Sequence, residues 1–279
     1  WDELLDGGLY SGEVTEIVGT AGSGKTQVCL SIASFVAMNL EKNIIYIDTQ
    51  GSFSSERIKE MLKARDSMLT EQDIISILSR IQCFQTFDLF GLVGCLNNAK
   101  NSFYSEDDIF YNNVQLIVVD SVASVLTPVL GGQQITGKTK FVGIFIPSHQ
   151  YPRHSMMVHL SRSLKSLAVQ HGLAVMVTNN VVSDSKALNT GGIKPALGPT
   201  WSHIPNTRVF IQKGTTSSNS HQTCERIATV TKSSRQVMNP LFEQPLFSLQ
   251  SQYNESLSYK LYGYVPPHRV WFSSFSGLG

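Results

Sequence analysis

The sequence predicts an α/β fold in which a mainly parallel sheet is flanked by helices. The first observation is that four short apolar runs, rich in β-branched residues, recur along the chain with helical patterns between them. Such alternation is typical of strand–helix–strand units that build a parallel sheet. The second observation is a later pair of strand-like runs joined by a polar segment, which indicates an antiparallel hairpin at the edge of that sheet.

The expected strands and helices follow from hydrophobic spacing, in chain order. The parallel strands are predicted at residues 14–18, 44–48, 116–120 and 174–178. Apolar residues at helical spacing predict one helix around residues 29–40 and another around residues 157–168. The hairpin strands are predicted at residues 207–213 and 226–232.

Two segments break these patterns. Residues 139–151 have the period of neither helix nor strand, so we interpret them as an insertion. Residues 248–279 lose periodicity and gather aromatic residues and a Pro-Pro pair, which favours an irregular tail or translated intron sequence. The domain prediction is therefore one core over residues 1–247, followed by that tail. Because the chain opens at Trp1 without a methionine, we expect it to be part of a longer protein.

Composition excludes several classes of protein. With 42% hydrophobic and 15% charged residues, the chain is unlike a disordered or collagen-like protein. A net charge of +1 supplies no global field for nucleic acid, so any DNA contact must come from local loops. The four cysteines lack the spacing of a disulfide framework, which favours a reduced, intracellular protein. No apolar run approaches the ~18 residues that span a bilayer, so we expect no membrane contact.

The strongest functional motif is a phosphate-binding loop of the GxxxxGK[ST] type, between the first predicted strand and the helix after it. Its residues are Gly19, Thr20, Ala21, Gly22, Ser23, Gly24, Lys25 and Thr26. Glycines let backbone N–H groups turn toward an anion, and the positive end of the helix dipole adds to their field. We expect Lys25 to contact the β and γ phosphates of ATP and Thr26 to bind Mg²⁺. The alternative is a glycine-rich turn with an incidental lysine.

Two more candidate residues end or follow predicted strands. Asp120 ends an apolar strand, and ligands bind at the carboxyl ends of parallel strands, so we assign it to the magnesium ion. The alternative is that Asp120 only caps the next turn. Gln50 stands where a group would orient or deprotonate the attacking water. Because an amide cannot accept a proton, we expect slow hydrolysis, although a purely structural amide stays an alternative.

Beyond the phosphate loop, the residues resemble the RecA-like recombinases of eukaryotes and archaea, a family with a P-loop ATPase core. The lead-in at residues 4–16 and the continuation at residues 24–29 carry this resemblance, which covers residues 1–247 except the insertion. Within the family, several segments are most similar to the D-type recombinase paralogs. These segments are residues 119–122, 130–134, 178–179, 194–198 and 232–236.

The resemblance implies an ATP- and Mg²⁺-binding subunit, in the nucleus, of a recombinase-paralog complex for homologous recombination and DNA double-strand-break repair. The implied partners are other paralogs, the strand-exchange recombinase and, weakly or through the complex, single-stranded DNA. The implied nucleotide contacts include Gln27, Arg57 and Asn180, with a surface role as the alternative for Arg57. Strand-exchange members carry glutamate at the position of Gln50 and glutamine at that of Asn180, so the resemblance does not imply autonomous strand exchange.

The resemblance also implies contacts outside the nucleotide site. Two loops that touch DNA in the family correspond to residues 131–137 and 183–192, with Lys186 and Lys194 as candidate DNA contacts. Cations without aromatic neighbours would bind single strands weakly, and plain surface loops are the alternative. Lys232 and Arg235 match positions near a neighbouring subunit's nucleotide, where cations stabilise developing phosphate charge. The alternative for both is a basic strand end.

Three functions therefore stay open. The first is an ATP-gated assembly protein, in which nucleotide binding orders the loops and the subunit interface. The second is an autonomous DNA-dependent ATPase with strand-exchange activity. The third is an unrelated P-loop kinase, which would need an acceptor site and a lid that the sequence does not indicate.

Overall fold

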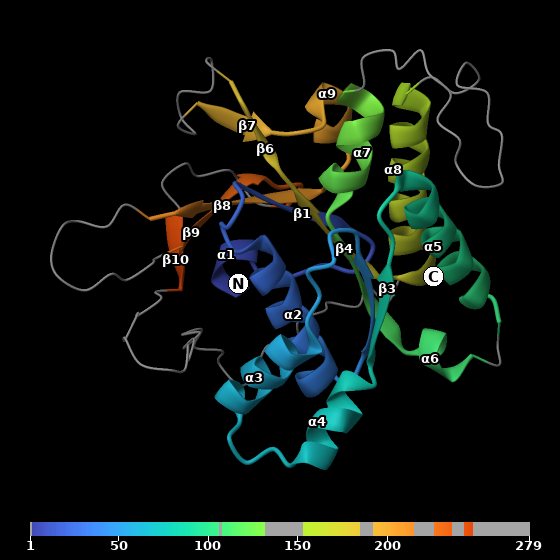
Figure 1. Ribbon diagram of the computed structural model, residues 1–279, viewed down its shortest axis with the longest axis vertical. Coiled ribbons are helices and arrows are strands. Elements are labelled where there is room, and N and C mark those ends of the chain that lie inside the picture. The colour runs from blue at the N-terminus through green and yellow to red at the C-terminus, as the bar shows by residue number, and fades with distance from the viewer. Residues whose placement is uncertain are drawn as a thin grey trace, which may run out of the picture.

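The α/β prediction is confirmed by the computed structural model, in which a parallel sheet is extended at one side by antiparallel strands (Figure 1). The model describes residues 2–105, 108–131, 153–184, 192–214, 226–235 and 243–247. The main sheet has the order β10-β9-β8-β1-β5-β4-β2-β3. Its strands are β1 (Val14–Gly19), β2 (Asn43–Asp48), β3 (Ile81–Gln85), β4 (Val114–Asp120), β5 (Ala174–Asn179), β8 (Thr207–Lys213), β9 (Arg226–Lys232) and β10 (Glu243–Phe247).

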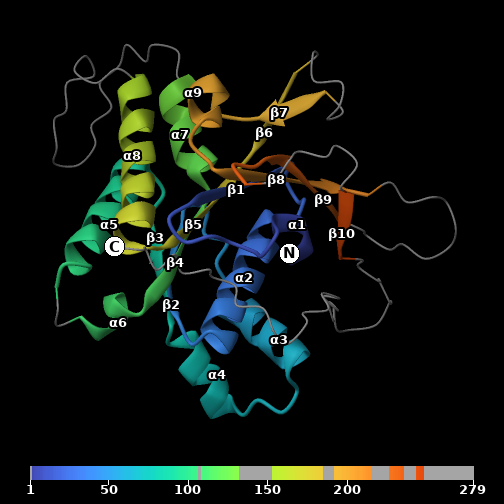
Figure 2. The ribbon, with the colours of Figure 1, turned by 180° about the vertical axis from the view of Figure 1, so that it is seen from behind.

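Strands β8, β1, β5, β4, β2 and β3 pair in parallel. Strand β9 pairs antiparallel with β8, and β10 pairs antiparallel with β9. The hairpin strands β8 and β9 have the predicted bounds, and the four predicted parallel strands extend by at most two residues. The edge strands β3 and β10 are additional to the prediction. So is a separate two-stranded ribbon of β6 (Val181–Ser183) and β7 (Ile193–Pro195), which lies beyond the main sheet, next to α9 (Figures 1 and 2).

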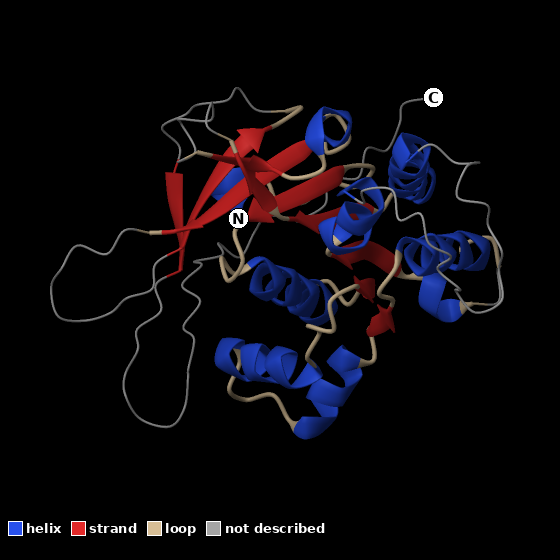
Figure 3. Ribbon diagram, turned by 45° about the horizontal axis from the view of Figure 1, so that its top comes forward, coloured by secondary structure: helices blue, strands red, loops and turns tan. Residues whose placement is uncertain are grey.

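Helices cover both faces of the sheet (Figure 3). The helices are α1 (Asp2–Leu5), α2 (Lys25–Asn39), α3 (Ser55–Arg65), α4 (Glu71–Leu78), α5 (Leu89–Ser102), α6 (Ile109–Asn112), α7 (Val122–Gly131), α8 (Arg153–His171) and α9 (Gly198–Ser202). Because successive strand residues face opposite sides, Ile17 packs in the core with α2, α3 and α4, whereas Val14 packs in the core with α5, α7 and α8. The helices α2 and α8 fulfil the two predicted helical patterns.

Local side-chain caps explain where three of the unpredicted helices begin. The Ser54 hydroxyl accepts a hydrogen bond from the backbone of Arg57 at the start of α3. Thr70 and Asp73 form a reciprocal capping box at α4, and Asp88 caps α5. Each cap satisfies backbone N–H groups that a helix start otherwise leaves without partners.

A buried ion pair ties the antiparallel side of the sheet to β1. Glu16 on β1 is fully buried and forms a salt bridge with Arg208 on β8. The other oxygen of its carboxylate accepts hydrogen bonds from Trp201 Nε1 and Asn179 Nδ2, each at 2.7 Å. These contacts fasten β5, β8 and α9 to the strand that leads into the phosphate loop.

Several predictions lie outside the described residues. They are the insertion at residues 139–151, the tail at residues 248–279, most of the first DNA loop and Lys186. The proposed domain boundary at residue 247 therefore stays a prediction. Among the described residues, no helix is both long and apolar enough to cross a bilayer.

Candidate nucleotide site

The phosphate loop connects β1 to α2, as the motif predicts. Gly19 is required by close packing, because a Cβ there would stand 2.4 Å from Ser23 Oγ and 2.5 Å from the carbonyl oxygen of Ile211. Gly24 is required by its backbone, since its φ of 104° is strained for side-chain-bearing residues. Gly24 also occupies the N-cap of α2 without any side-chain cap, so the helix start is open to an external anion.

Lys25 lies across this loop. Its Nζ donates hydrogen bonds to the carbonyl oxygens of Gly19 at 2.9 Å and Thr20 at 3.0 Å. Burial lowers the pKa of Lys25, whereas the negative charge of Asp120 opposes that shift. The ammonium group is therefore held at the loop by neutral carbonyls, which a phosphate can replace as a stronger, charged acceptor.

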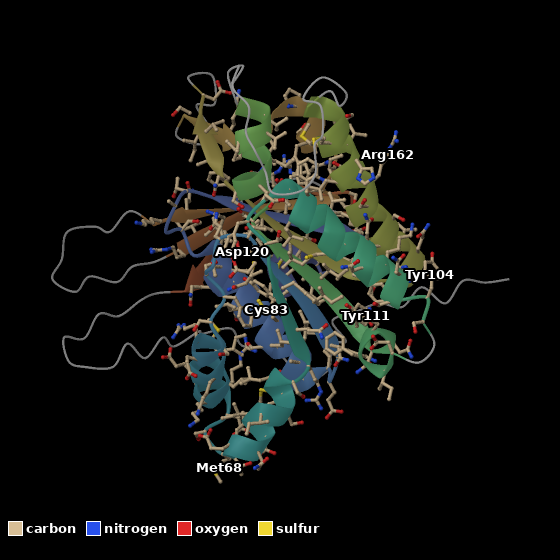
Figure 4. All side chains as sticks on the ribbon, turned by 45° about the vertical axis from the view of Figure 1, so that its right-hand side comes forward. Met68, Cys83, Tyr104, Tyr111, Asp120 and Arg162 are labelled. Atoms are coloured by element: carbon tan, nitrogen blue, oxygen red, sulfur yellow. The ribbon has the colours of Figure 1, made fainter. Side chains whose placement is uncertain are left out.

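Thr26 and Asp120 meet although 94 residues separate them in the chain. Thr26 Oγ1 donates to Asp120 Oδ2 at 2.7 Å, which places the two predicted magnesium residues in direct contact. Asp120 is 1% exposed and forms no salt bridge in the described part of the chain. Figure 4 shows Asp120 in the interior, whereas Met68, between α3 and α4, lies at the periphery.

Two hydroxyl groups that the sequence did not predict also bind Asp120. Tyr46 on β2 donates its phenol hydrogen to Asp120 Oδ2 at 3.1 Å, and Thr178 on β5 donates to Oδ1 at 2.5 Å. Burial, followed by the proximity of Cys29 and Asp120, raises the pKa of Tyr46 well above its usual value, so the phenol stays protonated as a donor. Both residues lie inside apolar strands, where a polar side chain within an apolar run is a sequence signal for a buried hydrogen bond but does not identify its partner.

Gln50 lies at the carboxyl end of β2, beside the end of β4. Its Nε2 donates to Ser121 Oγ at 3.1 Å, directly after Asp120. The backbone around Gln50 is held by the carboxylate of Asp48, which accepts the N–H groups of Gln50, Gly51 and Phe53 at 3.0, 2.9 and 2.8 Å. The role of Gln50 in orienting water stays a prediction. The residue does lie just after a parallel strand, at the carboxyl edge of the sheet where Asp120 also lies.

The resemblance assigns Gln27, Arg57 and Asn180 to the nucleotide. Arg57 Nε donates to Gln27 Oε1 at 2.9 Å, and a further Arg57 nitrogen pairs with Glu60. The structure thus joins two of the three residues across α2 and α3. Asn180 is half-buried directly after β5, and its carbonyl oxygen accepts the backbone N–H of Ala196 at 2.8 Å. The nucleotide roles of all three stay predictions.

The candidate DNA and interface cations that the structure describes have partners within the chain. Lys194 on β7 pairs with Asp184 at 3.1 Å, at the described base of the second loop. Lys232 Nζ donates to the carbonyl oxygens of Ser202 at 2.9 Å and Pro205 at 2.5 Å. Burial, then the nearby Arg208, lowers the pKa of Lys232.

Arg235 is held at the amino end of β1. Its Nε donates to Glu13 Oε1 at 2.7 Å, and its guanidinium lies 3.9 Å from the centroid of the Tyr10 ring. Glu13 precedes β1 and the phosphate loop follows it, so Arg235 lies at the opposite edge from its own loop. Contact with a neighbouring subunit's nucleotide stays a prediction for both Lys232 and Arg235.

The assembled residues fit a nucleoside triphosphate and its magnesium ion. Ser23 Oγ is fully buried within the loop and has no hydrogen-bond partner among the described residues. A buried hydroxyl without a partner is costly, and a phosphate oxygen is the acceptor that such a loop presents to it. This hydroxyl, the uncapped helix start, the Lys25 ammonium and the Thr26–Asp120 pair are together the kinds of group that a triphosphate requires.

Comparisons with known proteins identify a family for the chain. A family model described as Rad51 matches residues 1–236. The chain is 39% identical over 234 residues to "DNA repair protein RAD51 homolog 4" of Bos taurus, covering 84% of this chain. It is 38% identical over 239 residues to the protein of that name from Mus musculus and 28% identical over 239 residues to "DNA repair protein RAD51 homolog 2" of Homo sapiens. The chain spans 65% of the length of the two homolog 4 proteins and 58% of that of homolog 2.

Proposed function

This chain belongs to the Rad51 family, and from that premise we propose that it binds ATP with Mg²⁺ at residues 19–26 and acts in homologous recombination and DNA double-strand-break repair. It works in the nucleus as an assembly subunit, together with other recombinase paralogs and the strand-exchange recombinase. Single-stranded DNA is contacted weakly or through that complex. Nucleotide binding gates assembly, and hydrolysis is slow.

The contact between Thr26 and Asp120 carries the nucleotide part of this proposal. It brings a magnesium-binding hydroxyl and a carboxylate to the end of the phosphate loop, where Lys25 also lies. When bound, Mg²⁺ supplies positive charge against the triphosphate. Lys25 then binds and orients the phosphates, while the open start of α2 offers its N–H groups to them.

Slow hydrolysis follows from the hydrogen bonds of the nearby carboxylates. A general base must be able to accept a proton from water, and Gln50 has an amide at the expected position. Asp48 is the next carboxylate along this edge, but its two oxygens already accept three backbone N–H groups and are engaged in holding the turn. These contacts favour an ATP-gated assembly subunit over an autonomous DNA-dependent ATPase.

Calorimetry of ATP binding in the presence of Mg²⁺ tests the site. The Lys25→Ala variant should bind ATP about 10- to 100-fold more weakly, because it loses charge-assisted contacts to phosphate. Lys63→Ala is the matched control, since Lys63 is an exposed lysine that pairs with Glu71 on the α3–α4 surface. No heat of binding from the wild-type chain, measured together with its partner paralogs, would rule out the nucleotide site.

Partner association and turnover test the assembly role. Capture of partner paralogs should depend on ATP for the wild-type chain and lose that dependence in Lys25→Ala. The Gln50→Glu variant should raise ATPase activity if the missing base limits turnover. A wild-type rate of ~1 per second or more with single-stranded DNA would instead favour the autonomous ATPase.

A further inference from the structure

We propose that Tyr46 is a positioning residue for the magnesium-binding carboxylate of Asp120, an inference that rests on the proposed nucleotide function. Among the candidate nucleotide residues that the structure describes, Tyr46 forms its hydrogen bond with Asp120. It acts through its hydrogen bond to Asp120 Oδ2, from the strand next to that of Asp120.

The hydrogen bonds around Asp120 restrain its carboxylate at both oxygens. Oδ2 accepts from Thr26 and Tyr46, and Oδ1 accepts from Thr178, so donors arrive from α2, β2 and β5. A carboxylate with few contacts rotates readily about its terminal torsion, which is broad and nearly two-fold. Three donors from separate elements restrict that rotation, and the position of Oδ2 relative to Thr26 is fixed as a result.

Tyr46 has a distinct part in this restraint, because Thr26 is itself expected to bind the magnesium ion. The Thr26 hydroxyl can bind the ion through its oxygen while its hydrogen stays on Asp120, so Tyr46 is a second donor to Oδ2 that has no part in binding the ion. Tyr46 lies on β2, is fully buried and donates to Oδ2 from a different element than Thr26. Fixed outer hydrogen bonds of this kind orient metal ligands and tune their affinity.

A purely structural role is the competing explanation. Tyr46 faces the core that includes Ile17, Ile44 and Val118, and its ring packs 5.0 Å from that of Phe53. A phenol hydroxyl in such a place needs a partner, and Asp120 could serve only to satisfy it. The two explanations differ in one observable, since a structural hydroxyl contributes to folding but does not change how strongly Mg²⁺ favours nucleotide binding.

The experiment measures the dissociation constant of ATP with Mg²⁺ and with EDTA, and takes the ratio of the two. Tyr46→Phe removes only the hydroxyl and should reduce this ratio by about tenfold, the effect of losing one hydrogen bond to a charged group. Affinity in EDTA should change by less than about twofold. Circular dichroism and thermal melting establish that the variant is folded.

Two further variants separate the hydroxyl from the ring. Phe53→Leu disturbs the ring that packs on Tyr46 but leaves every hydrogen bond to Asp120, so its ratio should match the wild type. Thr178→Val removes the donor to the other oxygen and should reduce the ratio as Tyr46→Phe does. It also provides the test if Tyr46→Phe does not fold.

The outcomes distinguish this inference from the function on which it rests. A wild-type chain whose ATP binding is strengthened by Mg²⁺, with the same ratio in Tyr46→Phe, overturns the positioning role and leaves the proposed function intact. An equal loss in Phe53→Leu also overturns it, because the effect would then come from packing. A wild-type chain that binds no ATP overturns the proposed function and this inference together.

Discussion

Asp120 and Glu16 are two buried carboxylates, of which one accepts hydrogen bonds from hydroxyl groups and the other forms a salt bridge. Glu16 is matched by the guanidinium of Arg208, with Trp201 and Asn179 completing its hydrogen bonds. Asp120 is bound by three neutral hydroxyls, and no salt bridge to it is found in the described residues. Because a buried charge is costly unless it is paired, the difference teaches that Glu16 is paired within the chain, whereas the Mg²⁺ that we propose would add to the nearby charge of Lys25 in balancing Asp120.

The strongest test of this comparison is Glu16→Gln. The change leaves the Arg208 guanidinium buried without its counter-charge, and we expect a loss of about 3–5 kcal/mol in the free energy of unfolding. Chemical denaturation measures it. Glu13→Gln is the matched control, because the Arg235 side chain that pairs with Glu13 is 36% exposed, and we expect a loss of at most about 1 kcal/mol there. Equal losses in both variants would remove the distinction between a buried and a solvent-screened pair.

Asp120→Asn should have the reverse profile. We expect the strengthening of ATP binding by Mg²⁺ to fall about 10- to 100-fold, because the amide supplies no charge for the ion. The free energy of unfolding should change by less than about 1 kcal/mol, since the hydroxyls around residue 120 can rotate to accept hydrogen bonds from the amide. Calorimetry and denaturation of the same sample provide both values. A large loss of stability without a change in nucleotide affinity would show that Asp120, like Glu16, stabilises the fold and does not bind the ion.

Lys232→Met has the smallest expected effect and tests whether a half-buried cation with neutral partners contributes less to stability than the buried Glu16–Arg208 pair. The variant keeps an apolar stem but loses hydrogen bonds to Ser202 and Pro205, so we expect a loss of about 1 kcal/mol in the free energy of unfolding. Lys165→Met, at an exposed position on α8, is the control and should be nearly neutral. ATP-dependent partner capture by the same variant tests the predicted role at a neighbouring nucleotide. Unchanged capture would leave Lys232 with a purely internal role.

The buried parallel strands were predictable because each is a mainly apolar run, and the hairpin was predictable because two strand-like runs are joined by a polar segment. The edge strand β3 was not, because Ile81–Gln85 alternates partly buried and exposed residues and contains no long apolar run. Helices α3, α4 and α5 were not predicted, although the Thr70–Asp73 capping box at the start of α4 is readable in the sequence.

The candidate site was predictable only where a motif or a strand end marks it. Lys25, Thr26 and Asp120 carry such marks, and the structure brings them together. Tyr46 carries no such motif. Its hydroxyl reaches Asp120 because β2 and β4 lie side by side in the sheet.

The partners of residues that are far apart in the chain could not be predicted from the sequence. Glu16 carried a usable signal, since a charged residue inside an apolar strand requires a partner. The identity of that partner, Arg208, depends on β1 and β8 lying side by side. The same holds for Arg235, whose contact with Glu13 spans 222 residues.

The position of β1 has a consequence for how the chain is made. This first strand pairs on both sides with strands that are synthesised much later, β5 and β8. A nascent chain that has emerged only to residue 131 contains β1 and the phosphate loop, yet neither strand that flanks β1 in the finished sheet. Pairing across such sequence separations is slow, because the loop-closure entropy must be overcome before the contacts form. Chaperones that shield exposed strands during translation would therefore cover β1, next to the phosphate loop, until β5 and β8 have been synthesised.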